Sequence, residues 1–291
     1  MCAESPGSDD VLPPVLRGVP LPVHPSTSLR SSVTARLRAA GCVFAEDETR
    51  ILLSAADTPA RLATMIRDRA AGRPLEHVVG WAEFAGLRIS VDPGVFVPRR
   101  RSEFLVRTAA ALARENAQVV DLCCGSGALG AALAAEVGHP VRLCAADLDP
   151  AAVRCARRNL ARSAAPGTEV FEGDLFEALP TGLRGRVDVL LANVPYVPTA
   201  DIEFLPAEAR VHEARPALDG GADGLDVLRR VAAAAPHWLA PGGALLFETS
   251  DQQAEAALGV VAAAGLTAAL GYDEDLDATV VTAVRPPLGT P

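Results

Sequence analysis

Five short apolar segments recur through the second two-thirds of the chain, and each is followed by a stretch with helical spacing. A strand that is apolar along both faces must be covered by helices on both sides, as happens in a parallel sheet built from right-handed strand-helix-strand units. These segments therefore predict an α/β domain with a mostly parallel sheet. They are QVVDL (118–122), VRLCAAD (141–147), TEVF (168–171), VDVLLAN (187–193) and GALLFET (243–249).

Two further runs close the chain, GLTAALGY and ATVVTAV, separated by the acidic turn Asp273 to Asp277. This turn is too short to hold a helical crossover, so the two runs are expected to pair antiparallel. Together with the five earlier segments they make seven strands. The predicted fold class is α/β, with a mostly parallel sheet whose last strands are antiparallel.

The chain before this domain has a different pattern. Residues 1–25 are rich in Pro, Gly and Ser, which predicts an extended or disordered lead. Residues 26–78 have apolar residues at helical spacing and are expected to form a small helical domain. Residues 79–98 hold two β-type runs and predict a hairpin linker, after which residues 99–291 form the α/β domain.

Charge and composition narrow the expected partners. The formal net charge is −9, all 27 basic residues are Arg, and residues after 115 carry 12 Arg against 23 acidic residues. Such an acidic domain repels phosphate backbones, so nucleic acid is not expected as a partner. No apolar run is long enough to span a bilayer, which predicts a cytoplasmic protein without membrane contact. The six Cys show no metal-ligand spacing and are expected to be buried fillers, with no metal site.

A glycine-rich loop follows the first strand, in VVDLCCGSGALGAALA. Its three glycines are Gly125, Gly127 and Gly130. Small residues between a strand and a helix let the backbone approach a ligand and let the helix N-terminus face it. This spacing also satisfies the G-x-G-x-x-G pattern of NAD sites, in which Asp147 would hold the ribose.

Asp121 favours a different cofactor. It lies four residues before the first glycine, and this spacing is typical of motif I of methyltransferases that depend on S-adenosyl-L-methionine (SAM). Asp147 would then accept hydrogen bonds from both ribose hydroxyls. Asp174, in EGDLF, would contact the adenine amino group or cap the short helix after it. The predicted cofactor-binding residues are Asp121, Cys123, Cys124, Gly125, Ser126, Gly127, Asp147, Leu148, Asp174, Leu175 and Asn193.

The fourth strand runs directly into Asn193-Val194-Pro195-Tyr196. Methyl transfer to an amide or aryl-amine nitrogen requires its lone pair to be turned out of conjugation and aimed at the methyl carbon. Two acceptors that grip the two N–H bonds do this: the side-chain carbonyl of Asn193 and the main-chain carbonyl of Val194. Pro195 fixes the turn and Tyr196 offers a flat surface to a planar group. These four residues are the predicted catalytic set.

The ordered motifs resemble the protein-(glutamine-N5) methyltransferases of the HemK or PrmC type, whose members modify the Gln of the GGQ loop in peptide-chain release factors. The likeness covers roughly residues 30 to 285. It implies a Rossmann-like fold, SAM as cofactor with S-adenosyl-L-homocysteine as product, and a protein substrate read by the helical domain. Besides the loop and the turn, it is carried by AGRPLEHVVGWAEFAGLRISVDPGVFVPRRRSEFLV, DLDPAAVRCARRNL, GDLFEALP, HEARPALDGGADGLDVLRR and PGGALLFETSDQQ.

The chain departs from this family at three places. Val194 replaces the first Pro of the usual Asn-Pro-Pro-Tyr turn, Arg100 and Arg101 stand where a Pro and an acid are usual, and Ala214 follows Glu213 where the family has Pro. Because residue 194 contributes only its carbonyl, the expected chemistry is kept, and the acceptor is the property that these changes affect. Two other acceptors stay open, the N6 amine of adenine and the amine of a small molecule. A non-catalytic SAM-binding partner protein is less consistent with an intact Asn193.

Overall fold

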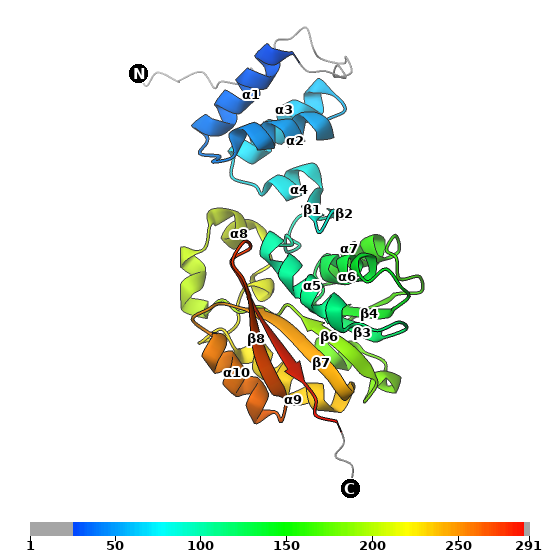
Figure 1. Cartoon of the computed structure of the whole chain (residues 1–291). Helices are drawn as coiled ribbons and strands as arrows, with labels where there is room; N and C mark the ends of the chain where they lie inside the picture. The colour runs from blue at the N-terminus through cyan, green and yellow to red at the C-terminus, as the bar shows by residue number, and fades with distance from the viewer. Residues whose placement is uncertain (1–25, 288–291) are drawn as a thin grey trace. The chain divides into compact units, whose positions relative to one another are not determined.

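The structure is a computed structural model that describes residues 26–287, so the Pro-rich lead lies outside the described residues. The chain divides into two compact units between Val79 and Gly80, and each is described by itself (Figure 1). No helix in the described range is both long and apolar enough to cross a membrane.

The first unit is built from helices. Its helices are α1 (Thr27–Ala39), α2 (Ala45–Ala55), α3 (Pro59–Ala70) and α4 (Leu75–Val79). Ser26 and Thr58 begin α1 and α3, because each side chain accepts a hydrogen bond from the third residue after it. Leu37, Leu52 and Leu62, one from each of the first three helices, are fully buried.

The second unit begins with a hairpin of β1 (Trp81–Phe84) and β2 (Leu87–Ser90). Ala85 and Gly86 both have positive φ, which matches the right-handed twist of the two strands. The hairpin is hydrogen-bonded to this unit, since the main-chain N–H of Ser90 donates to the Asn159 side chain. The short helix η2 (Arg100–Ser102) and α5 (Glu103–Leu112) follow it.

A seven-stranded sheet forms the centre of this unit, in the order β5-β4-β3-β6-β7-β9-β8. The first five strands in this order are parallel, and β9 is antiparallel to both of its neighbours. This confirms the predicted fold class and the antiparallel pairing of the last two runs. The strands are β3 (Gln118–Leu122), β4 (Arg142–Asp147), β5 (Glu169–Glu172), β6 (Val187–Ala192), β7 (Leu239–Thr249), β8 (Thr267–Asp273) and β9 (Ala278–Val284).

Helices cover both faces of the sheet, which explains why the central strands are apolar throughout. α5, α6 (Ala128–Glu136) and α7 (Pro150–Leu160) pack on one face, and α9 (Asp226–Trp238) and α10 (Ala254–Ala263) pack on the other (Figure 1). Shorter helices lie in the connections: η3 (Leu175–Ala178), η4 (Thr181–Leu183), η5 (Thr199–Phe204), α8 (Ala207–His212) and η6 (Arg215–Ala217).

The sheet order places the site. The connection after β3 leads to β4 on one side, while β6 pairs with β3 on the other side. In open α/β sheets, ligands bind beyond the carboxyl ends of the strands at the point where the strand order reverses. The ends of β3, β4 and β6 therefore bring together the glycine loop, Asp147 and Asn193.

Candidate active site

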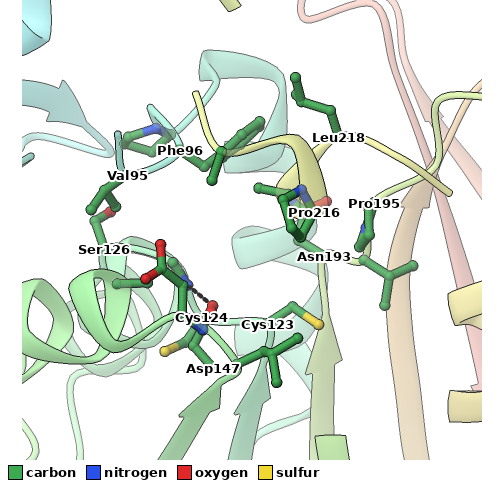
Figure 2. A pocket seen from close by; sticks show the side chains of 18 of the residues that line it. Val95, Phe96, Cys123, Cys124, Ser126, Asp147, Asn193, Pro195, Pro216 and Leu218 are labelled. Carbon is green, nitrogen blue, oxygen red and sulfur yellow. Dashed lines mark hydrogen bonds between the residues drawn. The ribbon is translucent and has the colours of Figure 1, made fainter. Parts of the chain in front are cut away.

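A cavity of about 990 Å³ opens beyond the carboxyl ends of β3, β4 and β6. Figure 2 shows Cys124, Ser126 and Asp147 on one side of it, with Asn193, Pro195 and Leu218 on the opposite side. The first group comes from the glycine loop and the end of β4. The second comes from the turn after β6 and from the segment around η6.

The loop between β3 and α6 adopts left-handed backbone at three positions, Cys123 (φ 54°), Gly125 (φ 53°) and Gly127 (φ 76°). Its glycines serve different purposes. A Cβ on Gly125 would meet open space, and Gly125 lines the cavity. A Cβ on Gly127 would lie 3.2 Å from the Ala156 backbone in α7, and Gly127 does not line the cavity. Of these two glycines, Gly125 therefore is the one that offers its bare main chain to a ligand.

Asp121 lies behind this loop and does not line the cavity either. It is fully buried, and its Oδ2 accepts a hydrogen bond of 3.0 Å from the main-chain N–H of Gly130 in α6. Its Oδ1 has no hydrogen-bond partner among the described residues. Burial raises the pKa of the Asp121 carboxyl to about 7. The structure thus places Asp121 as a support that ties α6 to β3.

Asp147, at the end of β4, faces the cavity. Its Oδ2 accepts from the main-chain N–H of Gly125 at 2.8 Å and its Oδ1 from that of Asp149 at 2.9 Å. A carboxylate oxygen accepts two hydrogen bonds, so each oxygen keeps capacity for a ligand hydroxyl. Burial also raises the pKa of Asp147.

The remaining predicted cofactor residues surround Asp147. Leu148 is 60% exposed and lines the cavity with Leu175, which has a positive φ of 48°. Asp174 precedes η3 but makes no capping hydrogen bond; its carboxylate instead accepts from Arg230 at 2.6 Å. Cys123 and Cys124 line the cavity as well, and burial raises the pKa of both thiols, so they stay neutral.

These residues fit SAM. The open face of Gly125 admits a ligand against the main chain, and Asp147 presents acceptor capacity for the two hydroxyls of a ribose. Asp174 also lines the cavity, with its carboxylate paired to Arg230.

Asn193 is the first residue of the turn that forms the acceptor side of the cavity. Its side chain lines the cavity and makes no hydrogen bond to any residue between 26 and 287, so the amide is free to bind a ligand. Val194 is 2% exposed and packs into the core, and its N–H has no acceptor in the described range. Pro195 and Tyr196 also line the cavity.

The loop of residues 218–224 holds the main chain of this turn. The Val197 N–H donates to Leu218 at 3.1 Å, and the Gly220 N–H donates back to Val197 at 2.8 Å. A Cβ on Gly220 would lie 2.7 Å from the carbonyl oxygen of Pro195, and one on Gly224 only 2.2 Å from that of Tyr196. Both positions require glycine because the loop packs directly on the backbone of the turn.

Gln253 joins the loop and the turn. Its Nε2 donates to the carbonyl oxygens of Tyr196 and Asp223, both at 2.9 Å, and its Oε1 accepts from the Ser250 hydroxyl at 2.8 Å. Gln253, Gly220 and Gly224 belong to no motif from which a site was predicted. The only signal for them was that they fall inside segments that carry the family resemblance.

Arg101, which the sequence marks as a departure from the family, fixes the Tyr196 side chain together with Ser102 and Glu248, whose roles no motif indicated. The phenol donates to Glu248 Oε1 at 3.1 Å, and Arg101 and Ser102 each donate to the same carboxylate at 2.6 Å. Arg101 also hydrogen-bonds the phenol oxygen. Burial, with the Glu248 charge next in size, raises the pKa of Tyr196, so the phenol stays protonated.

Comparison with known proteins agrees with this geometry. A family model described as "Methyltransferase small domain" matches residues 86–224. A release factor glutamine methyltransferase of Geobacter sulfurreducens is 42% identical over 201 residues, 69% of each chain. The chain belongs to the release factor glutamine methyltransferase family. It is therefore a SAM-dependent methyltransferase, as the glycine loop and the turn predict.

Other relatives show the range of the family. A release factor glutamine methyltransferase of Streptomyces coelicolor is 39% identical, covering 68% of this chain and 70% of its own. A 4-amino-L-phenylalanine/4-methylamino-L-phenylalanine methyltransferase of Streptomyces pristinaespiralis is 36% identical, covering 76% of this chain and 75% of its own. Among solved structures, a Pyrococcus furiosus methyltransferase matches with a TM-score of 0.52 at 17% identity, covering 69% of this chain and 90% of its own, which supports the fold.

Proposed function

We propose that the chain methylates the side-chain amide nitrogen of a glutamine in a protein, and that this glutamine lies in the GGQ loop of a peptide-chain release factor. The proposal is carried by the unpaired Asn193 amide at the carboxyl end of β6, which faces the same cavity as the glycine loop. It is supported by relatives that are named for this activity at 42% and 39% identity.

Asn193 and Val194 prepare the acceptor. The Asn193 side-chain carbonyl and the Val194 main-chain carbonyl accept the two N–H bonds of the substrate amide, which fixes the plane of its nitrogen. Holding the nitrogen in this way turns its lone pair toward the methyl donor. The entropic cost of orienting the nitrogen is then met on binding and does not add to the barrier of the reaction. When bound, SAM supplies a methyl group activated by the adjacent sulfonium.

The cofactor end is held by other residues. Gly125 lets the ligand approach the main chain, Asp147 binds the ribose hydroxyls, and Leu175 with Asp174 flanks the adenine. Tyr196, fixed by Glu248 and Arg101, packs on the flat face of the acceptor amide. A site that holds its groups in place before binding spends little free energy on reorganisation during the reaction.

The helical unit is proposed to contact the protein substrate. Val43 and Phe44 lie between α1 and α2, and their side chains are 83% and 70% exposed. We assign these two exposed apolar side chains to the contact with the protein partner.

An aryl amine is the second candidate acceptor. The relative from Streptomyces pristinaespiralis is named for methylation of 4-amino-L-phenylalanine, and it covers more of this chain than the first two relatives do. The same two carbonyls can grip the two N–H bonds of an exocyclic amine. Its ring would require more room beyond the turn than an amide does.

Mass spectrometry distinguishes the two. Purified release factors are incubated with the chain and isotopically labelled SAM, and the GGQ peptide is examined for one added methyl group. Asn193→Ala serves as the inactive control, and a release factor with its GGQ glutamine replaced serves as the substrate control. Methylation of 4-amino-L-phenylalanine with none of the release factor would overturn the proposal.

A further inference from the structure

A second, smaller cavity adjoins the acceptor end of the active site. Its volume is about 150 Å³, and it lies among residues of β7 and β9. Arg101 and Tyr196 line this cavity and also the large one. The two cavities therefore share these two residues, which we call the Arg101–Tyr196 wall.

Glu248 holds the wall in place. It is 3% exposed, and both of its oxygens are occupied: Oε1 accepts from Arg101 and Tyr196, and Oε2 accepts from Ser102 at 2.6 Å. A buried carboxylate requires paired charge and hydrogen bonds, and Arg101 provides both. Arg101 also contacts the phenol oxygen, so one guanidinium fixes both the carboxylate and the aromatic ring.

We propose that Arg101 is a specificity-determining residue, which closes the acceptor end of the cavity at the size of an amide and excludes larger flat acceptors. The proposal rests on the proposed function, because it assigns the preference for glutamine over an aryl amine to this wall. Arg101 takes no part in the methyl transfer itself. It holds Tyr196 against the acceptor, and its side chain fills the passage between the cavities.

The size of the second cavity supports this assignment. In volume it equals an apolar cavity of about 150 Å³ that holds a benzene ring. Without the Arg101 side chain, the acceptor end would extend into this volume and could receive the ring of an aryl amine. The newly reached surface carries Asp251 and Asp277, whose carboxylates suit the α-ammonium group of an amino acid such as 4-amino-L-phenylalanine.

The test compares two acceptors in variants of the full chain. Arg101→Met removes the guanidinium that contacts Tyr196 and Glu248, and Arg101→Lys keeps the charge without the forked geometry. Arg101→Met combined with Glu248→Gln avoids leaving a buried carboxylate unpaired if the single variant folds poorly. Arg100→Met is the matched control, because the Arg100 side chain is exposed and lines neither cavity.

We measure kcat and KM with a release factor and with 4-amino-L-phenylalanine, and SAM affinity by calorimetry. Arg101→Met and the double variant are expected to lower kcat/KM for the release factor at least about tenfold and to raise the ratio of aryl-amine to glutamine methylation by at least the same factor. Arg101→Lys should give kcat/KM values and an acceptor ratio between those of wild type and Arg101→Met. SAM affinity should stay at the wild-type value in all variants, and Arg100→Met should match wild type in every measurement.

Equal losses on both acceptors, or an unchanged ratio in both Arg101→Met variants, would overturn the role of the wall. If the wild-type chain does not methylate a release factor, the proposed function fails separately. The wall is then judged by the ratio between 4-amino-L-phenylalanine and free L-glutamine, whose amide carries no ring. This ratio rises in the Arg101→Met variants if the wall limits acceptor size, and it is unchanged if the wall has no such role.

Discussion

Replacing Asp121 with Asn should change how the stability of the fold depends on pH. The folded chain holds this carboxyl fully buried with one hydrogen bond, from the Gly130 N–H, and burial raises its pKa from 3.8 to about 7. The unfolded chain exposes the group and ionises it near the ordinary value. Between these two pH values the folded state therefore binds a proton that the unfolded state has lost.

This difference in proton binding determines how the free energy of unfolding changes with pH. Because the pKa is higher in the folded state, the stabilisation is complete below pH 3.8 and is lost as the pH rises to about 7. At about 1.4 kcal/mol per pH unit, the loss amounts to roughly 4 kcal/mol. Asn does not titrate, and its carbonyl keeps the hydrogen bond from Gly130, while its buried NH₂ costs about 1 to 3 kcal/mol for want of a partner.

Urea unfolding of both proteins without SAM, at pH 5 and pH 8, measures the effect. We expect the free energy of unfolding of wild type to fall, relative to that of Asp121→Asn, by about 1 to 3 kcal/mol between these two pH values. The comparison cancels every other titrating group. Equal pH dependence in the two proteins would refute the reasoning and would mean that Asp121 is ionised and paired at neutral pH.

Four other substitutions test the site. Asp147→Ala should weaken SAM binding in calorimetry by about 1.5 to 3 kcal/mol through lost hydrogen bonds, whereas tight NAD binding with none for SAM would contradict the cofactor assignment. Asn193→Asp should keep SAM binding and lower turnover at least about a hundredfold, because a fixed negative charge favours the sulfonium ground state over the charge-dispersed transition state. Val194→Pro should keep turnover within about tenfold, since the lost N–H has no acceptor in the described range. Gly224→Ala should lower turnover more than SAM affinity, because its Cβ would lie 2.2 Å from the Tyr196 carbonyl; Gly259→Ala, where a Cβ meets open space, is its control.

The sheet could be predicted because its physical basis is local. Strands covered on both faces are apolar throughout, and β3, β4 and β6 begin and end within one residue of their predicted bounds. β7 begins four residues earlier than predicted, at Leu239, because its first part pairs with β6 through a register shift. There a Cβ on Gly243 would lie 2.5 Å from the Val187 carbonyl, a contact that no local pattern reveals.

The supporting residues could not be predicted because their partners are far away in the sequence. Arg101 meets Glu248 across 147 positions, and Gln253 meets Tyr196 across 57. Glycine motifs also indicate a site without assigning each glycine. Gly125 and Gly127 are equivalent in the pattern, and only the packing of α7 shows that Gly127 serves the fold while Gly125 faces the cavity.

The support around the turn explains why Val is tolerated at position 194. The main chain on its carboxyl side is held by Gln253, Gly220 and Gly224, through hydrogen bonds and contacts made to Pro195, Tyr196 and Val197. A second proline is not required to fix a backbone that is already held from outside, and the buried Val side chain contributes about 1.5 to 3 kcal/mol by leaving water. Because residue 194 presents only its carbonyl to the acceptor, its side chain has little influence on which acceptor binds. Differences in substrate within this family should therefore depend on residues whose side chains line the acceptor part of the cavity. Arg101 is such a residue, and it also fixes Tyr196.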